Sequence, residues 1–146
     1  MKFSERLRRL LPGLWFGLLL AIAAIATPAA SGALDKAAFG DVARAIFARE
    51  APASVVLGLL LLIIERRDAL ARHLETGASQ FSLEMTLAIV ALLCTVAGYY
   101  GLLPAMEQAR TGGSTSLTFL QLHALSLAFF GIKGLAVLAL AWRAAR

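Results

Sequence analysis

The chain is poor in cysteine, histidine and charge. It has one cysteine, Cys94, so an internal disulfide and a cysteine-based metal cluster are excluded. It has two histidines, His73 and His123, and only 16% of its residues are charged. A glycine-rich phosphate loop and a nucleophile elbow are both absent, and Ser126 and His123 share their apolar run with no carboxylate. We therefore name no catalytic residue and favour a protein that is not an enzyme.

Hydrophobic residues make up 60% of the 146 positions, whereas soluble domains contain about 45–50%. A membrane helix needs about 20 apolar residues to cross a hydrocarbon core of roughly 30 Å. The chain has four runs of about that length, at residues 10–34, 47–66, 83–103 and 117–142. This pattern predicts an all-α membrane protein, a four-helix transmembrane bundle forming a single transmembrane domain over residues 1–146. The basic start and the first run also resemble a secretory signal, but the run is longer than a usual signal core, so we interpret it as a membrane helix.

An amphipathic helix is predicted between the first and second spans, over residues 36–49. Its apolar residues, among them Phe39 and Ile46, recur at helical spacing, and Asp35 is placed to cap its start. The alternative is that this segment extends the second span. Both interpretations stay open because the apolar part at residues 51–64 would reach only about 21 Å as a helix, too short to cross alone.

The ends of the spans carry recognisable signals. Ser82 is placed to cap the third span, with Glu84 in its first turn. Pro28 is expected to bend the first span, and Pro104 to end the third before a polar loop at residues 105–116. The charged segment after the second span is predicted to stay helical for a turn or two and to end near Gly77.

Lysine and arginine are distributed unequally between the two predicted sides of the membrane. Nine lie on one side: Lys2, Arg6, Arg8, Arg9, Arg66, Arg67, Arg72, Arg143 and Arg146. Four lie on the other: Lys36, Arg44, Arg49 and Arg110. The positive-inside rule therefore predicts a bacterial inner (cytoplasmic) membrane protein with both termini in the cytoplasm. Because these residues flank apolar runs and do not form one basic face, we predict no nucleic-acid partner.

The last run holds two ionisable side chains, His123 and Lys133, together with Ser126. Charges inside a membrane span are costly and point to function by default. At about 100° per residue, the three side chains share one helix sector of roughly 80°. We identify them as candidates for a ligand or ion pathway, and His123 as a candidate metal ligand. The alternative is that His123 is a packing residue and that Lys133 snorkels or forms a buried structural pair.

A second group of polar side chains is predicted near the outer face, at the tops of the spans and in the loop before the last one. Its members are Glu50, Tyr99, Met106, Glu107 and Arg110. Together with His123, a thioether and a carboxylate could bind copper or another transition metal. The alternative is a lid of ion pairs and hydrogen bonds over the bundle.

Short motifs spread along the chain give it a family resemblance. They are Trp15-x-Gly17, Pro28, Phe39-Gly40 and Phe47, then Pro104-x-Met106, Arg110 and Phe119-x-x-Leu122-His123-x-x-Ser126. This pattern resembles an uncharacterised bacterial four-helix membrane family, domain of unknown function four-one-four-nine. The resemblance implies distant kinship with CopD-type copper-resistance proteins and HemJ-type membrane proteins, and with it copper or haem as a cofactor held by membrane histidines. His73 and His123 are the histidines that this chain offers.

Three functions follow from these observations. We favour a structural or accessory membrane subunit, whose polar groups lock the bundle. The first alternative is a protein that binds or transports a small molecule or a metal ion of the copper type, which predicts a polar cavity reaching His123. The second alternative is a haem-binding membrane oxidoreductase. The expected partners are the lipid bilayer and either a second copy or another membrane protein, since Gly17, Ala21, Ala24 and Gly58 permit close helix contact.

Overall fold

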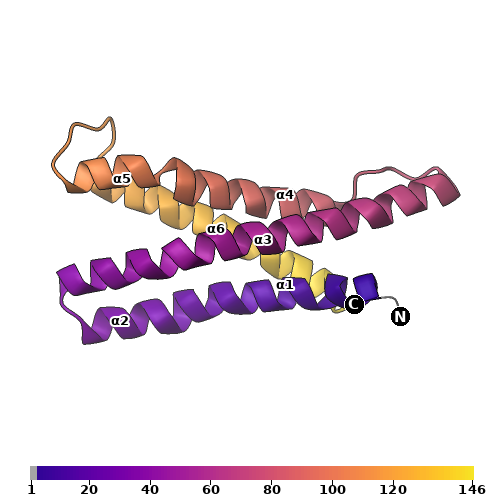
Figure 1. The fold of residues 1–146 in the computed structure, drawn as a ribbon, viewed down its shortest axis with the longest axis horizontal. Helices are drawn as coiled ribbons and strands as arrows, with labels where there is room; N and C mark the ends of the chain where they lie inside the picture. Colours follow the sequence, from indigo (N-terminus) through magenta and orange to yellow (C-terminus); the bar gives the residue numbers. More distant parts are fainter. Residues whose placement is uncertain (1–2) are drawn as a thin grey trace.

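The computed structural model describes residues 3–146, and over these residues it is helical with no strand. Long helical rods lie side by side (Figure 1). Within the described residues, 4 helices are long and apolar enough to cross a membrane: Phe3–Ala33, Lys36–Thr76, Leu83–Arg110 and Phe119–Ala144. The predicted all-α, four-helix membrane fold is confirmed.

Two of the rods contain a π-helical turn next to a proline. In the first rod, α1 (Phe3–Ala21) passes through η1 (Ile22–Ala26) into α2 (Thr27–Ala33), with Pro28 in the first turn of α2. In the third, η2 (Val96–Gly101) comes shortly before α5 (Leu103–Arg110), whose first turn holds Pro104. Proline has no amide hydrogen to donate, and the wider π-helical turn before it accommodates this loss within a continuous helix. The prediction that Pro104 ends the helix was therefore wrong, because α5 continues to Arg110.

The second rod, α3 (Lys36–Thr76), is one helix of 41 residues. Asp35 caps it by accepting a hydrogen bond from the Ala38 amide at 2.9 Å, and Gly77, with φ of 69°, ends it. The structure has no separate amphipathic helix at residues 36–49, which are the first turns of α3. Pro52 lies inside α3 with an exposed ring and does not end the helix. One missing backbone bond is outweighed here by packing on both sides of the proline.

Both of the last two rods begin with side-chain caps, of which the cap by Ser82 was predicted. Ser82 caps α4 (Leu83–Thr95) by accepting a hydrogen bond from the Met85 amide at 3.1 Å. Helix α6 (Phe119–Ala144) begins with a capping box, in which the Thr118 and Gln121 side chains each accept from the other residue's amide. The core forms where the four rods meet; its buried residues are Leu11, Trp15, Leu19, Leu61, Ala91, Ala136 and Val137.

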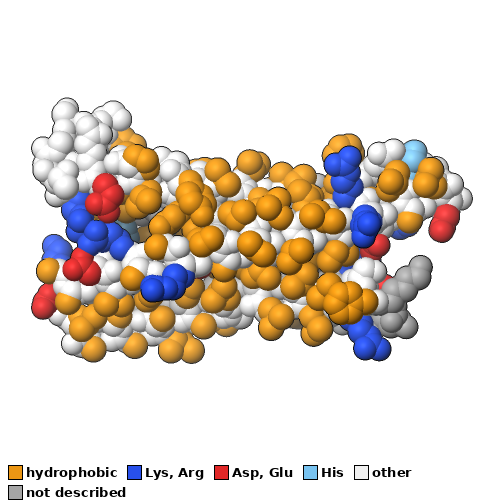
Figure 2. Space-filling model, viewed as in Figure 1, with side chains coloured by type: hydrophobic (Ala, Val, Ile, Leu, Met, Phe, Trp, Pro, Cys, Tyr) orange, Lys and Arg blue, Asp and Glu red, His pale blue; other side chains and the backbone are white. Residues whose placement is uncertain are grey.

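Charged side chains gather at the two ends of the bundle, and apolar side chains cover the surface between them (Figure 2). The start of α1, the connection at residues 77–82 and the end of α6 lie at one end, which we call the inner end (Figure 1). The connections at residues 34–35 and 111–118 lie at the other, the outer end. The four predicted spans gave this same grouping of the connections, on which the charge count was based.

Candidate functional site

A lysine and a glutamate form an ion pair in the interior of the bundle. Lys133 Nζ on α6 lies 2.7 Å from Glu50 Oε1 on α3, and the two side chains are 4% and 2% exposed. Lys133 stands near the middle of the 26-residue α6, and its side chain is directed into the bundle because the buried face of that helix includes Leu122, Val137 and Leu140. Both charges are thus removed from lipid and neutralise each other.

The pair continues into a hydrogen-bonded chain that joins three helices. The Ser54 hydroxyl, one turn after Glu50 on α3, donates to Glu50 Oε1. The indole Nε1–H of Trp15 on α1 donates to Ser54 Oγ at 2.8 Å. Trp15 and Ser54 are fully buried. We call Trp15, Glu50, Ser54 and Lys133 the central polar cluster, and each of its polar side chains has its partner inside the bundle.

Aromatic rings pack against the central polar cluster. Phe47 on α3 and Phe130 on α6 meet edge to face, with ring centroids 5.6 Å apart. Lys133 Nζ lies 4.9 Å from the centroid of the Phe130 ring, within the range of a cation–π contact. The ammonium group is therefore held by a carboxylate and by an aromatic face, and both partners are other side chains of the bundle.

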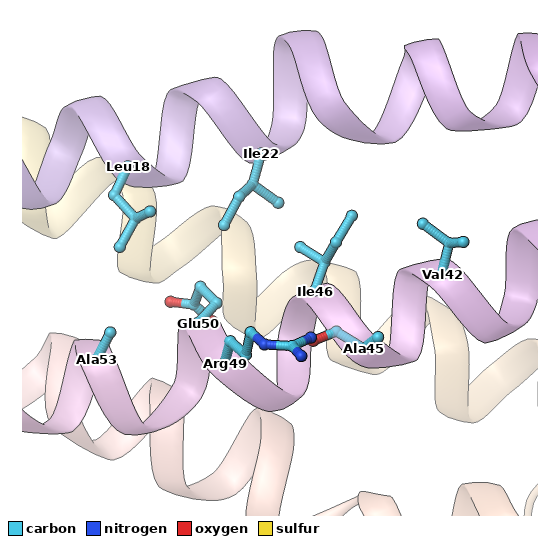
Figure 3. A pocket seen from close by; sticks show the side chains of 8 residues that line it. All are labelled: Leu18, Ile22, Val42, Ala45, Ile46, Arg49, Glu50 and Ala53. Carbon is cyan, nitrogen blue, oxygen red and sulfur yellow. The ribbon is translucent and has the colours of Figure 1, made fainter.

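A hollow of ≈ 430 Å³ lies between the first rod and α3, beside Glu50. Figure 3 shows the side chains around it, with Leu18 and Ile22 on one wall and the α3 residues on the other. The lining residues are Leu18, Ile22, Val42, Ala45, Ile46, Arg49, Glu50 and Ala53. Most of this lining is apolar, so the structure offers no wide polar channel at this point.

The three predicted pathway residues of α6 do not come together. His123 is exposed and stacks on Phe119, with centroids 6.2 Å apart and planes at 7°. Ser126 is half-buried and donates to the Gly98 carbonyl at 3.3 Å, while Lys133 faces Glu50. The buried face of α6 is centred near Lys133, and His123 lies about 80° around the helix from it. That rotation places the imidazole at the edge of the buried face.

The predicted outer-face cluster divides into two sets. Glu107 on α5 pairs with Arg44 on α3 at 3.6 Å and with Arg110, one turn along its own helix, at 3.4 Å. Tyr99 stacks edge to face on Tyr100, and Met106 is half-buried on α5. Glu50, in contrast, is buried with Lys133. It lies deeper because α3 starts at Lys36, which places Glu50 four turns into the helix and not at its top.

Residues 3–146 contain no group of three or more histidine, cysteine, aspartate or glutamate side chains arranged to hold a metal ion. His123 is therefore not part of such a group in the described residues. Cys94 is a buried free thiol on α4. The donor set in the described part of the chain fits neither a copper site of several histidines nor a bis-imidazole haem.

Sequence reasoning missed Trp15 and Ser54 in the centre, and an ion-paired cluster at the inner end. Arg8 on α1 lies 2.6 Å from Glu65 and 3.4 Å from Asp68, both on α3. Glu65 is only 2% exposed, so its carboxylate is buried within the bundle. A signal was present: Glu50, Ser54 and Glu65 recur on one face of α3, together with Leu61.

Comparison with known proteins identifies a family whose description assigns no function. The family model described as "Domain of unknown function (DUF4149)" matches residues 10–115, well over half of the chain. No curated protein matches. No solved structure matches.

Proposed function

Since the chain belongs to the DUF4149 family, whose description assigns no function, we propose a function from its geometry: an accessory membrane subunit whose internal ion pairs fix the arrangement of its four helices. One observation carries this proposal. The polar groups of the central polar cluster bond to one another, and the hollow beside it is mainly apolar. A protein that only has to hold a shape in lipid needs this closed arrangement.

The closed cluster explains how the bundle is held together. Lipid tails are as apolar as leucine, so apolar burial alone gives membrane helices little reason to associate. The bonds among Trp15, Ser54, Glu50 and Lys133 tie α1, α3 and α6 to one another. At the inner end, the pair of Arg8 with Glu65 adds a second tie between α1 and α3. These directional bonds select one helix arrangement.

The lipid-facing side of α1 offers a surface on which another membrane helix can pack. Gly13, Gly17 and Ala21 are exposed and follow one another at a spacing of four residues. A Cβ added at Gly13 or Gly17 would meet nothing within 4 Å. Such a small-residue stripe lets two helix backbones approach closely. It supports the accessory role, in which the bundle packs against a second copy or another membrane protein.

The accessory role is tested by the size of the protein in its native membrane. We expect native electrophoresis of mildly solubilised membranes to show a complex larger than one chain. In a Cys94→Ala background, we expect Gly17→Cys to cross-link within that complex, while Leu135→Cys, on an exposed face of α6, serves as the matched control. A monomer in native membranes, with equal and weak cross-linking at both positions, would refute the proposal.

A second candidate function is binding or transport of a small molecule or metal ion, and one observation favours it. Glu50 belongs both to the central polar cluster and to the wall of the hollow. A ligand that competes for Glu50 could thus reach Lys133. On this hypothesis the pathway runs past Glu50 and Lys133, and Ser126 and His123 lie about two and three turns from Lys133 toward the start of α6.

We infer the predicted orientation, with both termini in the cytoplasm and the membrane a bacterial inner membrane. Its support is the arrangement of the connections, because the start of α1, residues 77–82 and the end of α6 share one end of the bundle (Figure 1). Eight of the nine basic residues counted on that side belong to the start of α1, the last turns of α3 and the last residues of the chain, and the ninth, Lys2, lies outside the described residues. Reporter fusions at the two termini test this orientation.

A further inference from the structure

Arg49 differs from the other arginines of the outer end. Arg44 and Arg110 both form ion pairs with Glu107. Arg49 is exposed, and its guanidinium donates to the carbonyl of Ala45 at 3.2 Å, on its own helix. Within residues 3–146, no carboxylate forms an ion pair with it. Arg49 is therefore a cation on the apolar part of the bundle with no ion-pair partner among the described residues.

The depth of Arg49 places its guanidinium near the edge of the hydrocarbon core. It stands five residues below Arg44, or about 7.5 Å along α3. Its side chain turns back toward Ala45, which is the direction of the outer end (Figure 3). A long cationic side chain at this depth reaches toward the headgroup region and keeps its stem in lipid. The charge is thereby brought within reach of lipid phosphates.

Arg49 also lines the hollow of ≈ 430 Å³ between the first rod and α3. Pockets that hold small ligands have volumes of about 300–1,000 Å³, so this hollow is large enough for part of a lipid. Leu18, Ile22 and Ile46 give it apolar walls, as Figure 3 shows. Glu50 lies in the same wall, but Lys133 neutralises it. The net charge facing the hollow is therefore the single positive charge of Arg49.

We propose that this hollow binds one anionic phospholipid from the surrounding bilayer, with its phosphate on Arg49 and one acyl chain between the first rod and α3. A guanidinium can bind phosphate through two parallel hydrogen bonds, which distinguishes it from a point charge. The apolar walls accept a lipid chain, and the positive charge at the rim selects an anionic headgroup. This site is independent of the proposed accessory role, since it needs no protein partner.

The test counts the lipids that stay bound to the protein. The wild-type protein is reconstituted in nanodiscs of equal parts phosphatidylglycerol and phosphatidylcholine, and native mass spectrometry identifies retained lipids after release. We expect one phosphatidylglycerol, preferred over phosphatidylcholine by about tenfold, the size of effect that one charge-assisted contact gives. We expect Arg49→Gln to lose the preference. Arg67→Gln, an exposed arginine at the inner end, is the matched control and should keep it.

Further arms separate this proposal from other occupants. Ala53→Phe fills the hollow and leaves Arg49 intact, so we expect this variant to lose the lipid. It provides a second test that does not depend on whether Arg49→Gln folds. Addition of inorganic phosphate should not displace phosphatidylglycerol, and displacement would show a site for free phosphate. The proposal would be overturned if the wild type retained both lipids equally, or if Arg49→Gln kept the preference for phosphatidylglycerol. It would also be overturned if Ala53→Phe still retained the lipid, or if the protein were a lipid-free dimer.

Discussion

Removal of Lys133 alone should destabilise the bundle more than removal of both charges of its pair. The substitution Lys133→Met keeps most of the side-chain volume and leaves the Glu50 carboxylate buried, with Ser54 as its remaining donor. Loss of one partner of a buried pair costs about 3–5 kcal/mol. Because the Ser54 hydroxyl still donates to the carboxylate, we expect the lower part of that range, about 3 kcal/mol.

The double variant Lys133→Met/Glu50→Gln should recover most of this loss. The glutamine is neutral and can still accept the hydrogen bond from Ser54, so no charge is left buried. Replacement of buried pairs by neutral residues is often close to neutral in stability, so we expect the double variant within about 1 kcal/mol of wild type. Ile132→Met, on an exposed position of the same helix, serves as the control for a methionine in α6.

The assay is reversible unfolding in mixed micelles with increasing sodium dodecyl sulfate, followed by far-ultraviolet circular dichroism. Tryptophan fluorescence gives a second probe, since Trp15 is fully buried and Trp142 is exposed. Agreement of the two curves would justify a two-state free energy of unfolding. The reasoning fails if Lys133→Met is as stable as wild type, or if the double variant is less stable than the single one.

Three further predictions test the close helix contacts, His123 and the topology. Gly98→Ala should cost about 1–3 kcal/mol of unfolding free energy, because the added Cβ would lie 2.6 Å from the Phe129 Cβ, whereas Gly17→Ala has open space and should cost nothing. His123→Ala should not change the copper or haem content of the purified protein measured by mass spectrometry and absorption; loss of a stoichiometric metal or Soret band would make His123 a ligand. A cytoplasm-specific fluorescent reporter should be bright at both termini, and a dark carboxyl-terminal fusion would contradict the predicted orientation.

Three of the helix ends and the number of spans could be predicted from sequence because they depend on local signals. Asp35 and Ser82 cap helices as expected, and Gly77 ends α3 with a positive φ. The length of α3 could not be predicted, since residues 36–49 are amphipathic and precede Pro52. The same pattern fits a separate surface helix or one long helix. Packing against the other rods decides between them, and that packing has no local signature.

The site was predictable only in part, for the same reason. Lys133 stands out because an ionisable residue inside an apolar run has to find a partner. Its partner could not be identified, since Glu50 lies 83 positions away and was assigned to the outer face on the expectation that the second span begins at residue 47. The longer α3 moves Glu50 into the bundle. Trp15 and Ser54 were missed because neither tryptophan nor serine is unusual in a membrane helix.

The lysine–glutamate pair also separates the two proposed functions. If the pair only fixes the bundle, the double variant Lys133→Met/Glu50→Gln should keep both its stability and its complex in native membranes. If the pair binds or carries a ligand, the double variant should be stable and assembled but unable to act, because no ionisable group remains in the central polar cluster. Both hypotheses predict a stable double variant, so its stability reports only on folding and does not separate them. Complementation of a deletion strain by the stable double variant would then support the accessory role, and failure to complement would favour binding or transport.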